Sequence, residues 1–403
     1  MDRRSDERRL SRGHVRRAAA VTLALALTAT ATSTAAAAPP EATAKKNYIV
    51  QMALQPVATY TGGVAGLAAT KPAEGEKVDP AAPEVVEYAK HLRGKHRAAL
   101  QSVGAKDPLY QYVYSFDGFA TSLTAAQAAE LRTEPGVLAV TEDVLVHTTT
   151  ADTTATADDK DGDGEEGITV WGEPTAASAD DAPALFKGPA GHGKPAAAGE
   201  DVVIGVIDSG IWPDSASFSD KDKRGRPAYQ RLRGFDGECD DAETVGDDSW
   251  DDDSCNLKLV AAQHFNDGWG GDAGIAEQMP WEFQSARDYN GHGTHTASTA
   301  GGNKDVAVTG PLNKFSSTVS GVAPRARIAA YKALWSAEDG STASGYPSDI
   351  VAAVDQAVAD GVDVINFSVS GTLTDFLDPT ELAFLAAAQA GVFVSASAGN
   401  SAL

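Results

Sequence analysis

The run Val202-Val-Ile-Gly-Val-Ile-Asp-Ser-Gly-Ile-Trp-Pro213 is the most informative part of this 403-residue sequence. The run is apolar as far as Ile207, which is typical of a parallel strand that is buried on both faces. Asp208 follows directly, and a carboxylate is costly to bury unless a charged or hydrogen-bonding group meets it. The run therefore predicts a buried strand that ends in an aspartate with a functional, capping or turn role.

Further apolar runs and helical patterns follow this strand and extend the same design. Strands are expected at residues 328–334, 362–367 and 392–397, and helices at 348–359 (with Ser348 as the N-cap) and from the capping box Asp378-Pro-Thr-Glu381 to about Gly391. Helices of this length between apolar strands imply right-handed crossovers and a parallel sheet. The expected fold is α/β, a doubly wound parallel sheet, and Asp208 stands at the carboxyl edge where active groups gather.

A second informative segment is Asn290-Gly-His292-Gly-Thr-His295-Thr-Ala297. The glycines on both sides of His292 allow a close backbone approach, and the small residues after it suit the start of a packed helix. The helix dipole disfavours a positive charge at that end, so His292 is expected to stay near neutral, as a general base requires. The alternative is a metal site at His292 and His295, but no Glu lies between them and no further His lies nearby.

Residues 47–143 have a different pattern, with the element order β-α-β-β-α-β. Strands are expected at residues 48–52, 109–114, 119–123 and 137–140, and helices at 84–103 and after the capping box Thr124-Ala-Ala-Gln127. This order is that of a ferredoxin-like α+β domain, and about 100 residues are sufficient for one.

These motifs resemble those of one family. Residues 201–403 look like the first part of the catalytic domain of the subtilisin-like serine proteases (subtilases), on the Asp motif Gly205–Pro213 and the His motif His292–Ala297. Cys255-Asn-Leu-Lys-Leu259 resembles the cucumisin-like branch. Residues 47–146 resemble the inhibitory prodomain of the same family, with Tyr48-Ile-Val50 and Gly118-Phe-Ala120 as markers.

The resemblance implies a role for each matching residue. Asp208 would orient His292 and stabilise its imidazolium, while His292 would take the proton from a serine hydroxyl and return it to the leaving amine. The segment Ser368, Val369, Ser370 and Gly371 would bind substrate backbone, although the family usually has Gly where Ser370 stands. Asn400 would donate a hydrogen bond in the oxyanion hole.

The Gly-Thr-Ser motif that supplies the family's nucleophile is absent from this sequence. We therefore expect the chain to be truncated before the catalytic Ser and to be inactive alone. Two other readings remain open: a non-enzymatic inhibitor or binding protein built on the prodomain, and a metallohydrolase that uses His292 and His295.

The N-terminus predicts export. Residues 1–17 are rich in Arg, and residues 18–38 form an Ala/Leu/Thr segment that ends in four alanines, the pattern of a signal peptide. Cleavage is expected after Ala36 or Ala37, because Pro39 disfavours a cut directly before it. The alternative, a membrane anchor, is weakened by the Thr and Ser residues in the segment.

Export to an oxidising environment permits disulfides, and Cys239 and Cys255 are the only two cysteines. We expect them to pair, the alternative being two free thiols. The expected organisation is a signal peptide at 1–38, an inhibitory prodomain at 47–147, a linker and mature N-terminal region at 148–200, and the catalytic part at 201–403. The prodomain would assist folding and block the cleft with its C-terminal strand, near residues 147–150.

The net charge of −23 argues against nucleic acid as a partner and favours a soluble monomer, but it does not name a substrate. The signal peptide implies an extracellular location, and the family resemblance implies proteins or peptides as substrates. No organic cofactor and no metal are implied. Calcium is the one alternative, at Asp159–Gly164 or at the acidic residues 236–253. Asp159–Gly164 resembles the start of a twelve-residue calcium loop, but the twelfth residue, Val170, is not the glutamate that such a loop needs. In the second segment, runs of carboxylates usually form solvated loops.

Overall fold

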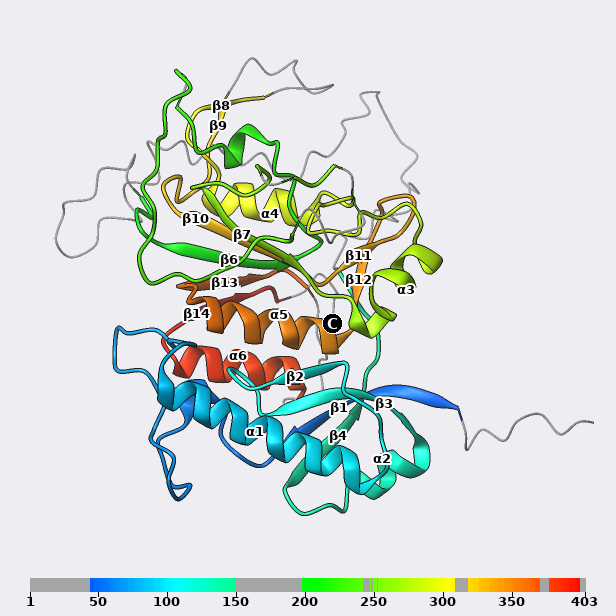
Figure 1. Cartoon of the computed structure of the whole chain (residues 1–403). Helices are drawn as coiled ribbons and strands as arrows, with labels where there is room; N and C mark the ends of the chain where they lie inside the picture. The colour runs from blue at the N-terminus through cyan, green and yellow to red at the C-terminus, as the bar shows by residue number, and fades with distance from the viewer. Residues whose placement is uncertain are drawn as a thin grey trace, which may run out of the picture. The chain divides into compact units, whose positions relative to one another are not determined.

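The computed structural model describes residues 44–148, 198–222, 224–241, 247, 249–251, 253–308, 318–369 and 377–398 (Figure 1). The expected signal peptide, most of the expected linker, Ser370, Gly371 and Asn400 lie outside these residues, as does the segment Asp159–Gly164. Among the described residues, no helix is both long and apolar enough to cross a membrane.

The first part of the described chain is the expected ferredoxin-like unit. Its elements are β1 (Lys45–Met52), α1 (Pro83–Ser102), β2 (Tyr110–Tyr112), β3 (Gly118–Thr124), α2 (Ala125–Leu131) and β4 (Val137–Glu142), with a 3-10 turn, η2 (Val57–Thr59), after β1. The four strands form an antiparallel sheet in the order β2-β3-β1-β4. The predicted capping box is present, because Thr124 and Gln127 bond each other's backbone at the start of α2.

This sheet buries both of its faces. On β1, Tyr48, Val50 and Met52 pack with α1 and α2 in one core. Ile49 points the other way, into a second core that contains residues of α5 and α6. Alternation along one strand therefore joins the ferredoxin-like unit to the rest of the chain.

The second part is built on a five-stranded sheet whose neighbouring strands are all parallel. The strands are β6 (Val203–Asp208), β7 (Leu259–His264), β10 (Arg327–Lys332), β13 (Val364–Phe367) and β14 (Phe393–Ala396), in the order β14-β13-β6-β10-β7. Figure 1 shows α4 (His292–Gly301) on one face, and α5 (Pro347–Asp360) and α6 (Pro379–Gln389) on the other. The prediction of a doubly wound α/β fold is confirmed.

Shorter elements complete the described structure. They are the 3-10 turns η5 (Ala216–Phe218) and η6 (Asp267–Trp269), helix α3 (Gly271–Gln278), and the strands β5 (Val146–His147), β8 (Val306–Ala307), β9 (Thr318–Val319), β11 (Trp335–Ser336) and β12 (Ala343–Gly345). Strand β5, which follows the ferredoxin-like unit, forms a small sheet with β12 and β11. A segment from the first part of the chain thus lies in a sheet of the second.

One prediction about helix starts is wrong. Ser348 is not the N-cap of α5, because the helix begins at Pro347 with Tyr346 at the cap position and no side-chain cap bond. Instead, the carboxylate of Asp143 accepts a hydrogen bond of 3.0 Å from the backbone amide of Ser348. A carboxylate from a distant part of the chain therefore does the work expected of a local side chain.

A second carboxylate joins the two parts of the chain. Asp355 of α5 accepts hydrogen bonds from the backbone amides of Val113, Tyr114 and Ser115, at 3.0, 2.8 and 2.6 Å, and from the hydroxyl of Ser115 at 3.1 Å. Asp355 is buried, so these donors replace the water that the carboxylate loses. The loop after β2 is thereby fixed to α5.

Candidate active site

Asp208 is the last residue of β6 and lies at the carboxyl edge of the parallel sheet. Its side chain is fully buried. The backbone carbonyl accepts hydrogen bonds from the amides of Ala333 and Leu334, which follow the neighbouring strand β10. The end of one strand therefore anchors the end of the next, and the carboxylate position is set by the sheet.

His292 is the first residue of α4, and two glycines place it there. Gly291 adopts a left-handed conformation with φ of 93°, which few residues other than glycine adopt. Gly293 lies so close to Gly210 that an added Cβ would be 2.3 Å from the Gly210 carbonyl oxygen. The close approach expected from the sequence is thus made by Gly293, and it brings α4 against the loop after Asp208.

The two side chains meet directly. Nδ1 of His292 lies 2.7 Å from Oδ1 and 2.9 Å from Oδ2 of Asp208. Because an ionised carboxylate only accepts, this contact places a proton on Nδ1 and leaves Nε2 as the basic nitrogen of the neutral ring. Thr296, one turn further along α4, donates to Oδ2 of Asp208 at 3.3 Å.

The charge state of His292 differs from the expectation based on the helix dipole. The hydrogen bond to Asp208 raises the pKa of His292 above its usual value, and burial opposes this rise only in part. The prediction of a histidine held near neutral by the helix N-terminus is therefore wrong in its direction. A raised pKa still suits a base, since it increases the affinity of Nε2 for the proton that is to be transferred.

Asp288, which the sequence analysis did not single out, organises the start of α4. One carboxylate oxygen accepts from the amide of Gly291 and the hydroxyl of Ser209, and the other accepts from the amide and hydroxyl of Thr294. Ser209 in turn accepts from the amide of Gly293 at 2.9 Å. The position of Asp288, three residues before the N-cap, is a weak capping signal that could have drawn attention to it.

Of the expected substrate-binding segment, the structure describes Ser368 and Val369. Val369 forms an antiparallel bridge with Thr148, directly after β5. On its other side, Thr148 donates its backbone amide to the Ala343 carbonyl at 2.7 Å, and its side-chain hydroxyl oxygen accepts from the Ala343 amide at 3.0 Å. Thr148 therefore lies between β12 and Val369.

Strand β5 and Thr148 lie along the β11–β12 hairpin. Residues 146, 147 and 148 pair in turn with residues 345, 344 and 343 of β12, so the strand points along the hairpin toward Gly340. The carbonyl of Gly340 accepts a hydrogen bond of 2.9 Å from the side chain of Asn290, two residues before His292. Through Gly340, the hairpin on which this strand lies is hydrogen-bonded to the segment that leads into His292.

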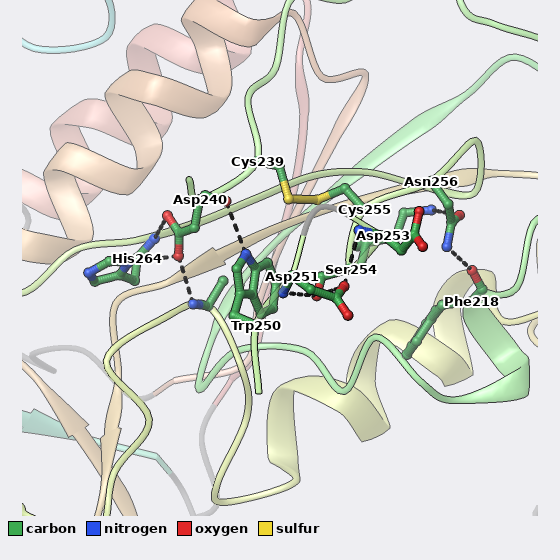
Figure 2. Close-up of a disulfide and its surroundings, with 12 residues drawn as sticks. Phe218, Cys239, Asp240, Trp250, Asp251, Asp253, Ser254, Cys255, Asn256 and His264 are labelled. Atoms are coloured by element: carbon green, nitrogen blue, oxygen red, sulfur yellow. Dashed lines mark hydrogen bonds and ion pairs between the residues drawn. A yellow bond between two sulfur atoms is a disulfide. The ribbon is translucent and has the colours of Figure 1, made fainter. Parts of the chain in front are cut away.

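The predicted disulfide is present. Cys239 and Cys255 are bonded across 16 residues of sequence, and Figure 2 shows the carboxylates of Asp240 and Asp251 next to the disulfide, each hydrogen-bonded to a protein donor. Asp240 bonds His264 and Asp251 bonds Ser254. The described residues contain no group of three or more His, Cys, Asp or Glu side chains that could hold a metal ion.

His264, at the end of β7, lies between two carboxylates. Its Nδ1 is 2.7 Å from Asp240 and its Nε2 is 3.0 Å from Asp272. Burial would lower the pKa of His264, but the hydrogen bonds to both aspartates outweigh it and raise the pKa to about 9. His264 is thus a protonated link between the disulfide region and α3.

The raised pKa of His264 predicts a pH-dependent stability. The usual pKa is 6.5 and the folded value about 9, so the stabilisation is fully present below 6.5 and is lost as pH rises through 9. We expect His264→Gln to lower the free energy of unfolding most near pH 6 and least near pH 9.5. Urea unfolding of both proteins across this range measures the difference, and a difference independent of pH would contradict the assignment.

Comparison with known proteins agrees with this geometry. A model described as the subtilase family matches residues 199–402, and one described as peptidase inhibitor I9 matches residues 47–149. Subtilisin-like protease SBT2.5 of Arabidopsis thaliana is 36% identical over 370 residues, 89% of this chain and 40% of that relative. Subtilisin-like protease SBT1.5 of the same plant is 42% identical over 204 residues, 50% of this chain and 24% of that relative.

Among solved structures, fervidolysin from Fervidobacterium pennivorans, a keratinolytic enzyme related to subtilisin, aligns with 89% of this chain and 40% of its own. The identity is 15% and the TM-score 0.42, so the fold assignment rests on the strand order described above.

The chain thus combines a ferredoxin-like unit that matches the peptidase inhibitor I9 model with a parallel α/β sheet. The chain belongs to the subtilase family. It spans about 40% of the length of SBT2.5 and of its Arabidopsis relative SBT2.6.

Proposed function

We propose that this chain is part of a secreted serine endopeptidase precursor in which Asp208 and His292 form the acid–base pair. The observation that carries the proposal is the contact between Nδ1 of His292 and the buried carboxylate of Asp208. This contact fixes the ring tautomer, so that Nε2 takes the proton of an attacking hydroxyl and later gives it to the leaving amine. Asp208 stabilises the imidazolium that forms in between.

The nucleophilic serine of this reaction lies, in our proposal, outside residues 1–403. The family's Gly-Thr-Ser motif does not occur in the printed sequence, and the two cysteines are joined to each other. Neither thiol is therefore free to replace the serine. Residues 1–403 alone would bind a substrate and orient His292, but they would not form an acyl-enzyme.

The substrate class follows from the pairing around Thr148. A strand with β12 on one side and Val369 on the other is held by its backbone, which suits proteins and peptides as substrates. We assign substrate-backbone binding to Ser368, Val369, Ser370 and Gly371, and an oxyanion-hole amide to Asn400. These assignments rest on the family motifs.

The ferredoxin-like unit acts in our proposal as an intramolecular inhibitor. Its C-terminal strand, Val146–Thr148, occupies the backbone-binding positions that a substrate would take, and Asp143 and Asp355 fix the unit to α5. Release would require cleavage of the chain beyond Thr148 and separation of this interface. Export through the signal peptide at residues 1–38 places this maturation outside the cell.

Peptide hydrolysis tests the proposed function. We expect residues 1–403 to hydrolyse no peptide, whereas the protein extended by its downstream sequence should process itself beyond Thr148 and then cleave peptides. The measurement is turnover of a mixed peptide library, with the new N-terminus read by mass spectrometry. Hydrolysis by residues 1–403 that persists in His292→Ala would disprove the assignment of the acid–base pair.

A further inference from the structure

The described residues around the disulfide lie against the segment that leads to His292. We define the disulfide loop as residues 239–241, 247, 249–251 and 253–255. In this loop, Asp240 accepts a hydrogen bond of 2.7 Å from the amide of Ala286, and Asp247 accepts one of 2.6 Å from the hydroxyl of Ser285. The carbonyl of Ser249 accepts from the guanidinium of Arg287. Three consecutive residues are thus each held by the loop.

The same segment is held on its opposite side by the chain that follows Asp208. Ile211 donates its amide to the carbonyl of Ala286 at 2.9 Å and accepts from the amide of Asp288 at 3.1 Å. The bridge between Ile211 and Arg287 is parallel. Residues 285–288 therefore form a strap between the disulfide loop and the loop that carries Asp208.

The strap ends at Asp288, which holds the first turn of α4. Because Asp288 accepts from the amides of Gly291 and Thr294, a shift of its backbone would also shift His292, which lies between these two residues. The contact with Asp208 is short, and small displacements of a base from its partner are costly in such sites. The position of the strap therefore bears on the geometry of the acid–base pair.

Within the disulfide loop, Asp240 is the residue most completely held in place. It follows Cys239, whose backbone bridges Ala262 of β7, and its carbonyl accepts from the indole of Trp250 at 3.0 Å. The carboxylate contacts protonated His264 (Figure 2) and also accepts from the amide of Ala286. The sheet, the disulfide and a buried cation thus all fix the oxygen that bonds the strap.

We propose that Asp240, held by the Cys239–Cys255 bond, is a positioning residue that fixes the strap 285–288 and through it the contact between His292 and Asp208. This inference rests on the proposed function, since it assigns a purpose to that contact. It adds to the reaction a residue that touches neither substrate nor the reacting atoms.

The titration of His292 in the oxidised 403-residue chain tests the proposal without requiring activity. We expect Asp240→Ala to move the pKa of His292, followed by NMR of the ring, toward the ordinary value of 6.5. Cys239→Ser with Cys255→Ser should move it in the same direction. Asp240→Asn keeps an oxygen acceptor for the amide of Ala286 and should recover most of the wild-type pKa.

Asp251→Ala is the matched control, because Asp251 lies in the same loop but its described bonds run only to Ser254 and to the amide of Asp253. It should leave the pKa of His292 unchanged. If Asp240→Ala leaves it unchanged as well, or if Asp251→Ala lowers it equally, the positioning role is wrong. If Asp240→Ala does not fold, the comparison of Asp240→Asn and the double serine variant with wild type decides.

Asp208→Asn separates failure of this inference from failure of the proposed function. This variant removes the anion that raises the pKa of His292, and defines the lowest value expected. A wild-type pKa equal to that of Asp208→Asn would contradict the proposed acid–base pair itself. A normal effect of Asp208→Asn with no effect of Asp240→Ala would contradict only the role of the disulfide loop.

Discussion

Replacement of Asp208 by Asn is expected to lower peptide turnover by about 10⁴ in a protein that also supplies the nucleophilic serine. The amide would still fill the buried site, but it could donate to His292 and so favour the wrong tautomer. It would also carry no charge to stabilise the imidazolium. Because Asp208 is fully buried beneath His292, no solvent ion can replace that charge.

Replacement of His292 by Ala should cost at least as much, because it removes the base itself. The double variant should lose little beyond the worse single change, since the members of such a site act as a unit. His295 is the control, because it is exposed on α4 and its ring has no role in the proposed reaction. A folded His295→Ala protein as inactive as His292→Ala would mean that the wrong histidine has been assigned.

The second large effect is expected at Asp355. Asp355→Ala would leave three backbone amides without their acceptor, and each buried donor left unpaired costs about 1–3 kcal/mol. Because some of these amides will be rehydrated, the free energy that holds the ferredoxin-like unit in place should fall by roughly 3–4 kcal/mol, which is a factor of about 10²–10³ in its docking equilibrium.

Hydrogen exchange in the 403-residue chain measures this effect. The amides of Val113, Tyr114 and Ser115 should lose protection by about that factor, while the inner core of the ferredoxin-like unit around Val50 keeps its protection. Asp339→Ala is the control, since Asp339 is an exposed turn residue that accepts from the amide of Ser341. Unchanged protection at residues 113–115 would show that Asp355 does not hold the interface.

The sequence predicted those elements whose local pattern and tertiary environment agree. The apolar run before Asp208 is a fully buried parallel strand, and the predicted capping box of Thr124 and Gln127 opens α2. By contrast, β7 was not predicted, because its short run Leu-Val-Ala-Ala contains alanines, which have low strand propensity. Helix α3 was not predicted because two of its eight residues are glycines.

The parts of the candidate site that were missed depend on distant partners. Asp288 contacts Ser209, 79 residues away, and no local pattern specifies that pairing. The expected effect of the helix dipole on His292 was outweighed by Asp208, 84 residues away. Ser348 did not become an N-cap, because Asp143 from another part of the chain meets its amide. In each case a tertiary contact overrides a correct but weaker local rule.

In the proposed reaction His292, oriented by Asp208, activates a serine that residues 1–403 do not contain. Labelling with a fluorophosphonate probe, followed by peptide mapping, tests it most directly. We predict a single labelled serine in the downstream sequence of the extended protein, no labelling in His292→Ala, and none in residues 1–403 alone. Stoichiometric labelling of residues 1–403 at Ser368 or Ser370, or labelling that persists in His292→Ala, would contradict the account.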